Sequence, residues 1–365
     1  VQGVGMALFM TASLGALSAG TVEPFRTRAV GVWSAVGGLA LAVGPLVGGV
    51  LTDLGSWRWF FLADLPPLVV GLVLVHRSVH DGPDARAAGE RPPLDLRAAV
   101  AVTVAVAALT AAVQSAGTRG GPSAPGLLAL AVAGGAALVF GRRERRPAPP
   151  PVVERALWRR GAFWAPVAVA LLANVGFGAL QFLLTLALQD VAGWTPLEAG
   201  GAFLLYSVPF AVVGLRIGHL TGRLGDRWAL VLGQVLIAAS FVAVAVLAGT
   251  STVTASLVGL AVAGLGQGLA FTLTTSTSLA AAPAADASVA SGLLTTARNL
   301  GIVAGITVAT LALDRSGGGV PQSVTAGAAA PAAASAAFAD GLRVASVVLV
   351  AVSLAGAAVA ARRSS

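Results

Sequence analysis

The sequence contains no cysteine, no lysine and only 3 histidines, and charge of either sign is scarce. Arginine supplies all 23 basic residues, acidic residues number 15, and charged residues make up 10% of the 365 positions, against about a quarter in a soluble domain. Without cysteine the chain has neither disulfides nor thiolate metal sites. The remainder is largely apolar. With 56% hydrophobic residues the mean hydropathy is +0.86, which predicts a protein that crosses a membrane many times.

The sequence patterns of a membrane-embedded enzyme are also missing. There is no HExxH pattern and no cluster of histidine and acidic residues in the apolar stretches, so we expect no metal, no other cofactor and no enzyme. The net charge of +8 comes without a basic patch interleaved with aromatic residues, which argues against a nucleic-acid partner and favours arginine-rich membrane loops. Gly264 to Phe271, GLGQGLAF, has glycines like those of a dinucleotide-binding loop. It lies in an apolar stretch with no preceding strand, so close helix packing is the better interpretation.

Apolar runs long enough to cross a hydrocarbon core of ~30 Å occur along the whole chain. They predict an all-α polytopic membrane protein with about eleven transmembrane helices, near residues 1–20, 30–51, 59–75, 98–116, 124–141, 162–188, 197–217, 229–248, 253–278, 289–313 and 341–361. Alternating the loops between two sides leaves only Arg58, Arg119, Arg315 and Arg343 on one of them. The other side, which includes the C-terminus, is therefore predicted to be cytoplasmic. The low-complexity stretch Pro321 to Ala339 is expected to be an outer loop.

One apolar run contains an unusual set of residues. Within Ala40 to Leu51, ALAVGPLVGGVL, lie Gly44, Pro45, Gly48 and Gly49. Proline removes a backbone donor and favours a kink, while glycines expose backbone to which another helix can approach closely. The spacing alone is equally compatible with an ordinary tight helix crossing.

Three segments in the same order resemble the major facilitator superfamily. GPLVGG resembles its antiporter signature GxxxGPxxGG, with Ala40 in place of the first glycine; Gln2 to Leu8 is similar to the end of an RxxQGxGAA motif. Ser56 to Pro66, SWRWFFLADLP, is similar to a segment of the fourteen-span drug:proton antiporter family. Farther on, Leu188 to Gly200, LQDVAGWTPLEAG, matches the pattern LQxVxGxSPLEAG. In this last segment we expect a turn at Gly193 to Pro196, followed by a capping box of Thr195 and Glu198.

The resemblance implies a division of the chain. Residues 1–75 would be the second half of an N-terminal helix bundle, and 76–161 would hold inner linkers and two extra spans at 98–116 and 124–141. Residues 162–365 would form a complete C-terminal six-helix bundle. Since the superfamily begins on the cytoplasmic side, the first three spans of fourteen are expected to be absent, making the major facilitator fold N-terminally incomplete.

A second motif lies between two predicted spans. Gly222 to Arg227, GRLGDR, resembles the superfamily's cytoplasmic GxLxDR element. The resemblance implies a latch built from Gly222, Leu224, Asp226 and Arg227, in which the acid pairs with a neighbouring arginine in one conformation and releases it in the other. The alternative is a solvated turn worth under ~1 kcal/mol.

Polar and aromatic residues within the predicted spans are candidates for a substrate cavity, since polar side chains in a membrane need a partner or water. The set is Asn174, Gln181, Tyr206, Gln267, Phe271, Arg298 and Asn299. An amphiphilic or cationic small molecule would suit aromatic faces and amides. For each residue singly, hydrogen bonding between helices is an equal or better explanation. Asp64, where the family commonly has asparagine, is a weak candidate proton site beside the alternative of an interfacial residue.

The resemblance to the drug:proton antiporters implies a proton-coupled exporter of drugs or antibiotics that works by alternating access, although no residue of this sequence shows the proton coupling by itself. We expect it in the inner membrane of a bacterium, with the lipid bilayer, protons and a small molecule as its partners. A major facilitator exporter of a metabolite or amino acid, or an inactive truncated transporter, are the alternatives.

Overall fold

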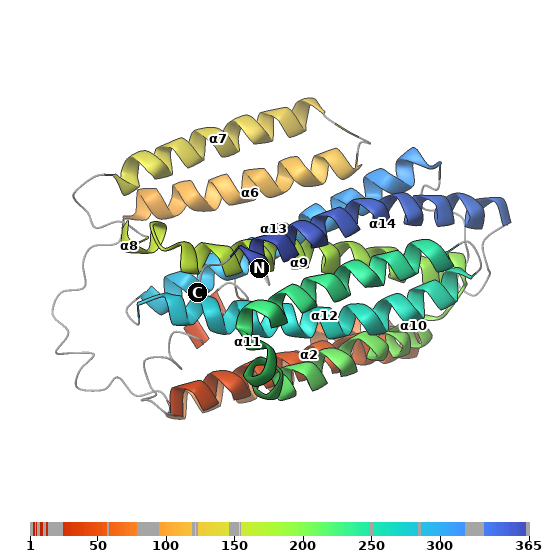
Figure 1. Ribbon diagram of the computed structural model, residues 1–365, viewed down its shortest axis with the longest axis horizontal. Helices are drawn as coiled ribbons and strands as arrows, with labels where there is room; N and C mark the ends of the chain where they lie inside the picture. The colour runs from red at the N-terminus through yellow and green to blue at the C-terminus, as the bar shows by residue number, and fades with distance from the viewer. Residues whose placement is uncertain are drawn as a thin grey trace.

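The computed structural model describes residues 25–56, 58–78, 95–118, 121, 123–145, 153, 155–248, 251–283, 286–317 and 332–362, with a few positions between 3 and 13. Its described regular elements are all helical, which confirms the predicted class (Figure 1). They are α2 (Phe25–Leu54), α3 (Arg58–Ala63), α4 (Leu65–Ser78), α6 (Leu96–Thr118), α7 (Ala124–Glu144), α8 (Arg155–Trp158), α9 (Gly161–Leu186), a π-helical turn (Ala187–Val191), α10 (Pro196–Ala202), α11 (Leu204–Leu247), α12 (Thr252–Ala281), α13 (Ala287–Arg315) and α14 (Ala332–Ala361).

In the described part of the chain, 8 helical stretches are long and apolar enough to cross a membrane. One of them, Pro196–Leu247, covers 52 residues and contains the two predicted spans 197–217 and 229–248. Gly225 divides it, with φ +73 and ψ 156 in the middle of α11. Helix α2, 30 residues long, contains the predicted span 30–51. The predicted span 1–20 lies almost wholly outside the described residues, so the total of eleven stays a prediction.

The helices of the C-terminal part pack into one bundle. α9, α11, α12, α13 and α14 contact one another and bury a continuous apolar core that includes Leu184, Phe241, Leu260 and Leu349. The α6/α7 pair lies at its edge, with α6 against α13 and α7 mainly against α6 (Figure 1). Helix α2 contacts the bundle through α10 and α11. Apolar burial of this kind fixes which helix faces can line a site.

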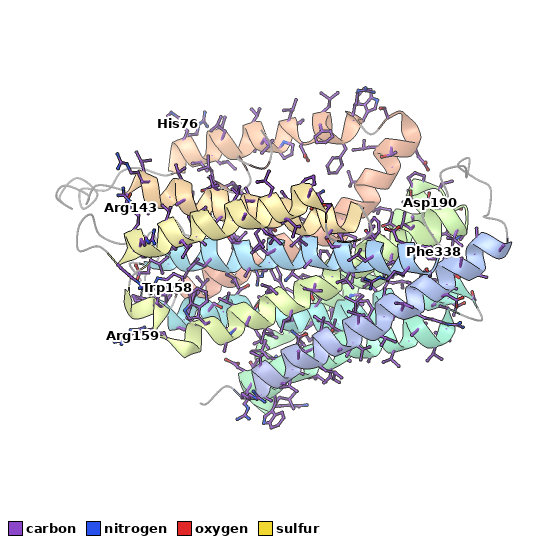
Figure 2. The ribbon with its side chains drawn as sticks, turned by 90° about the horizontal axis from the view of Figure 1, so that it is seen from above. His76, Arg143, Trp158, Arg159, Asp190 and Phe338 are labelled. Atoms are coloured by element: carbon purple, nitrogen blue, oxygen red, sulfur yellow. The ribbon has the colours of Figure 1, made fainter. Side chains whose placement is uncertain are left out.

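The two ends of the molecule carry different loops. Figure 2 places His76, Arg143 and Arg159 at one end and Asp190 and Phe338 at the other. The first three belong to segments that the alternation of loops predicts on the cytoplasmic side, and the last two to segments predicted outside. The helices therefore run back and forth in the order that the sequence predicts.

The last helix begins earlier than predicted. The loop expected over Pro321 to Ala339 ends sooner, because α14 starts at Ala332, ahead of the predicted span 341–361. The segment from Ala332 to Asp340 is rich in alanine, the strongest helix former, and Phe338 is buried at 1% exposure. In this alanine-rich segment the sequence does not distinguish a loop from a helix, and the structure has about two more turns of packed helix than predicted.

The segment that joins α9 to α10 folds as its motif predicts. Gly193 adopts φ +72, and Thr195 is the N-cap of α10. The Thr195 hydroxyl accepts from the Glu198 amide at 3.2 Å, and the Glu198 carboxylate accepts from the Thr195 amide at 2.8 Å. This capping box satisfies backbone donors that would otherwise be orphaned at the helix start. It holds the first turn of α10 in a fixed place.

Candidate functional site

A row of aromatic side chains crosses the interior of the C-terminal bundle. Phe177 of α9 lies 5.5 Å from Tyr206 of α11, ring centre to ring centre, and Tyr206 stacks on Phe210 at 6.1 Å. Phe210 in turn lies 5.6 Å from Phe271 of α12. The row ends at α13, where the guanidinium carbon of Arg298 stands 3.9 Å from the centre of the Phe271 ring. Four helices thus contribute one continuous series of ring contacts that ends at a positive charge.

The glycines of the GLGQGLAF segment make this row possible. A Cβ at Gly268 would lie 2.8 Å from the carbonyl oxygen of Phe210, and one at Gly264 would collide with the carbonyl oxygen of Tyr206. Because neither glycine has a side chain, α12 and α11 approach backbone to backbone at the level of the two aromatic residues. The structure confirms that this segment serves close helix packing.

Arg298 is held by neutral groups only. It is 9% exposed, and its Nη2 donates to the Phe271 carbonyl at 2.9 Å and to the hydroxyls of Thr274 and Thr275 at 3.0 and 2.7 Å. Its Nε is buried and has no hydrogen-bond partner among the described residues, and no carboxylate of those residues lies within 4.0 Å. A buried guanidinium without a counter-ion is costly. Arg298 therefore keeps unused capacity for a polar or negative group.

The Tyr206 hydroxyl also has no hydrogen-bond partner among the described residues. Tyr206 itself is 3% exposed. A buried hydroxyl usually finds a partner. The two ends of the Tyr206–Phe210–Phe271–Arg298 series thus both carry an unsatisfied polar atom.

The other cavity candidates do not join the row. Asn174 is buried and its amide donates to the Ala170 carbonyl of its own helix at 2.8 Å. Gln267 is buried on α12 between the packing glycines, while Gln181 and Asn299 are exposed. Three of the seven predicted residues, Tyr206, Phe271 and Arg298, are therefore brought together by the fold.

The sequence analysis did not identify two residues of the aromatic row. Phe177 and Phe210 were not predicted, because a phenylalanine in an apolar span looks like ordinary core. A signal was present in the spacing: Phe210 follows Tyr206 by four residues, and Phe271 follows Gln267 by four, so each pair shares a helix face.

The glycines of the GPLVGG segment in α2 have different surroundings. A Cβ at Gly49 would lie 2.7 Å from the carbonyl oxygen of Pro196 and 3.0 Å from the Cα of Leu197. At Gly48 the nearest atoms belong to the Phe60 ring, at 3.8 Å, and at Gly44 no atom of the described residues lies within 4 Å. α2 is assigned as one helix through Pro45. The close contact of this motif is thus Gly49 against the capped start of α10, where two sequence motifs meet.

The GRLGDR segment forms the break within α11. Leu224 and Asp226 are exposed there, and so is Gly222. The Arg227 guanidinium donates to the Ala361 carbonyl at the end of α14 and lies 5.4 Å from the centre of the Trp228 ring. Asp226 has no ion pair with any described residue. Arg227 connects this turn to α14 in the present conformation.

Asp64 lies between α3 and α4, where its carbonyl accepts from the Leu68 amide at 3.2 Å. Asp64 is partly exposed, and the main contacts of α3 and α4 are those of α3 with α2 and of α3 with α4. Within the described residues no group of three histidine or acidic side chains is placed to hold a metal.

Comparison with known families decides what this bundle is. The family model described as Major Facilitator Superfamily matches residues 1–306. The chain belongs to the Major Facilitator Superfamily. Membership of this superfamily and the 8 long apolar helical stretches of the described residues agree on a multi-pass membrane protein.

Curated superfamily members with similar sequences are named for drug resistance. The chain is 30% identical to the multidrug resistance protein Stp of Mycobacterium tuberculosis over 84% of its own length and 56% of Stp. It is 29% identical to a methylenomycin A resistance protein of Streptomyces coelicolor, over 84% of this chain and 63% of that one. It is 31% identical to the methyl viologen resistance protein SmvA of Salmonella typhimurium, over 86% of this chain and 62% of SmvA. The chain spans somewhat more than half the length of these relatives.

Proposed function

We propose that this superfamily member exports drug-like amphiphilic small molecules through a cavity bordered by the aromatic row and Arg298. The single observation that carries the proposal is this row, contributed by α9, α11, α12 and α13 and ending in a buried guanidinium with unused hydrogen-bonding capacity. Aromatic faces bind flat or cationic molecules, and a few polar atoms orient them. The drug-resistance names of the relatives support the same substrate class.

Alternating access needs two states that differ in a contact between helix groups. In the state described here Gly49 of α2 rests against Pro196 and Leu197 of α10. We assign this contact the role of a seal at the end of the molecule that carries Asp190, predicted to face outward. At the opposite end the Arg227–Ala361 contact joins α11 to α14 within the C-terminal bundle and holds the turn from Gly222 to Arg227. We assign the exposed Asp226 of this turn the role of a latch that pairs with an arginine in one state and releases it when the bundles rock.

The proposal also includes coupling to protons, a location in the inner membrane of a bacterium and a cytoplasmic C-terminus. It further includes the division of the chain into residues 1–75, 76–161 and 162–365, as part of a fourteen-span transporter. The arginine-rich segments around His76, Arg143 and Arg159 share one end of the molecule, which supports that end as the cytoplasmic one (Figure 2).

Drug accumulation in living cells tests the proposal. The full chain is produced in a bacterium that lacks its own drug exporters, and uptake of methylenomycin A, methyl viologen and an amino acid is measured with and without a proton uncoupler. We expect lower accumulation of at least one drug, reversed by the uncoupler. Export of the amino acid alone, or no export of any compound by a chain shown to be in the membrane, would refute it.

Arg298→Gln tests the site within the same assay. Loss of the guanidinium removes ~1–2 kcal/mol of interaction with a polar or negative group of the drug, so the concentration of an uncharged or anionic drug for half-maximal export should rise about 5- to 30-fold, whereas export of a cation such as methyl viologen should not weaken. Arg315→Gln, at the exposed end of the same helix, is the matched control and should export like the native chain. Equal export by both variants would remove Arg298 from the site.

A further inference from the structure

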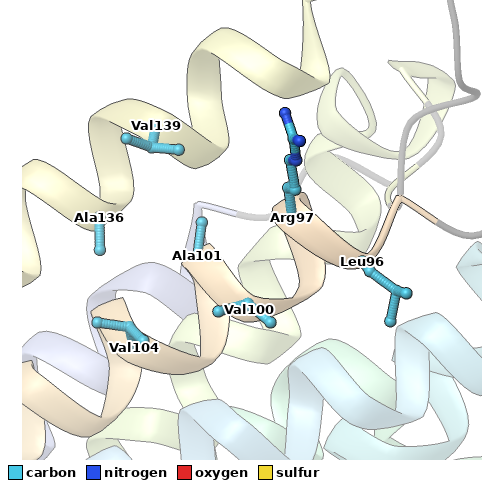
Figure 3. A pocket seen from close by; sticks show the side chains of 7 residues that line it. All are labelled: Leu96, Arg97, Val100, Ala101, Val104, Ala136 and Val139. Carbon is cyan, nitrogen blue, oxygen red and sulfur yellow. The ribbon is translucent and has the colours of Figure 1, made fainter.

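The α6/α7 pair at the edge of the bundle contains a groove that is separate from the aromatic row of the proposed transport path. It lies between α6 and α7 and has a volume of about 420 Å³. Figure 3 shows its lining, which consists of Leu96, Arg97, Val100, Ala101, Val104, Ala136 and Val139. Arg97 is the one charged residue in this lining, and the others are aliphatic.

The length and place of the groove match part of a lipid. Arg97 to Val104 covers seven steps of an α-helix, about 10 Å at 1.5 Å per residue. This is a third of a hydrocarbon core of ~30 Å, within the depth of a single leaflet. The groove begins at the first turn of α6, at the end of the molecule that carries Arg143 (Figure 2). A chain entering there would run from the membrane surface toward the midplane.

Among the described residues, none neutralises the charge at the mouth of the groove. The carboxylate of Asp95 is already engaged: its Oδ1 accepts from the Arg97 and Ala98 amides, each at 3.0 Å, and its Oδ2 lies 3.4 Å from Nη1 of Arg143. The exposed Arg97 guanidinium has no hydrogen bond or ion pair with the residues that the structure describes. Arg142, exposed in the last turn of α7, directly precedes Arg143, which contacts Asp95.

We propose that this groove binds one anionic phospholipid, with a phosphate on Arg97 and an acyl chain along Val100, Ala101 and Val104. An apolar slot that ends at the membrane surface in a guanidinium with no ion pair to the described residues is complementary to a negative headgroup joined to a hydrocarbon tail. The lipid would contact α6 and α7 together. Since α7 packs mainly on α6, it would hold the pair to the bundle's edge.

Lipid retention by the purified full chain tests this site. The protein is mixed in detergent with phosphatidylglycerol or phosphatidylcholine of identical acyl chains, and bound lipid is counted by native mass spectrometry. We expect one phosphatidylglycerol to be retained about fivefold more tightly than phosphatidylcholine, the preference that one arginine near a membrane surface provides. Arg97→Gln should abolish the preference, while Arg362→Gln, exposed at the end of α14, should keep it.

A second variant addresses the acyl chain. Val104→Trp fills the groove from an exposed position and should reduce retention of both lipids, whereas Val347→Trp, on the exposed face of α14, should not. Equal retention of the two lipids by the native chain, or an unchanged preference in Arg97→Gln, would overturn the proposal. So would displacement of the lipid by an exported drug, or a dimer that forms through the α6/α7 face and excludes lipid.

Discussion

Gly49 is the residue at which the N-terminal part of the chain touches the C-terminal bundle most closely. A Cβ at Gly49 would have no room beside Pro196, while a Cβ at Gly44, in the same helix, would have no described residue within 4 Å. We expect Gly49→Ala to cost the α2–α10 contact ~1–3 kcal/mol by overpacking. That would shift the population about 5- to 150-fold toward forms in which the two helices are apart.

Drug export and cross-linking between α2 and α10 measure this effect. Gly49→Ala should lower both the export rate and the cross-linking yield, with unchanged amounts of protein in the membrane. Gly44→Ala is the matched control and should behave like the native chain. If the two variants were equally active and cross-linked equally well, the seal assigned to Gly49 would be wrong.

The break in α11 shows how one residue determines an element. Gly225 has φ +73 and ψ 156, a region almost closed to other residues, yet nothing lies within 4 Å of its missing Cβ. Gly225→Ala should therefore destabilise the protein by about 1–3 kcal/mol through backbone strain alone. Gly222→Ala, in the same turn with equally open space, should be neutral or stabilising because alanine favours helix. Thermal unfolding of the two variants measures the difference, and a stable Gly225→Ala would contradict it.

We expect the stability of the contact between α6 and α7 to depend on pH through Asp95. The backbone amide of Ala98 donates to this carboxylate and lowers its pKa below the usual 3.8; the charge of Arg143 acts in the same direction, and burial opposes both. A carboxylate with a lowered pKa stabilises the fold above its ordinary pKa, and this contribution is lost as the pH falls through the folded-state value.

The pH dependence of unfolding tests this assignment. The melting temperature of native protein should exceed that of Asp95→Asn at pH 7, and the difference should shrink below about pH 4. A difference that persists unchanged at pH 3 would mean that Asp95 acts through packing and not through its charge.

At the level of elements, local signals in the sequence predicted local structure well. The capping box of Thr195 and Glu198 and the close packing of Gly264 to Phe271 depend on neighbouring residues, and the structure has both. Other contacts depend on which helices become neighbours in the fold. They include the ring contacts of Phe177 and Phe210 and the contact of Gly49 with Pro196. Hydrophobic periodicity gives the apolar face of a helix but not its partner, so these contacts could not be read from the sequence.

At the scale of the whole molecule, the account depends on helices that alternate in direction and leave most arginines at one end. The class of fold, the family and the order of loops followed from apolar runs, arginine placement and motif order. The start of α14 did not, because alanine-rich sequence without charge fits both a helix and a low-complexity loop.

Because the native chain has no cysteine, single cysteines can be introduced and labelled without background. The most direct test is labelling of intact cells with a membrane-impermeant thiol reagent at Asp314→Cys, Asp340→Cys, Arg145→Cys and Arg223→Cys. We predict that the first two are labelled from outside, and that the last two are labelled only after the cells are opened. Labelling of Arg145→Cys and Asp314→Cys from the same side would contradict the alternating topology and, with it, the proposed exporter.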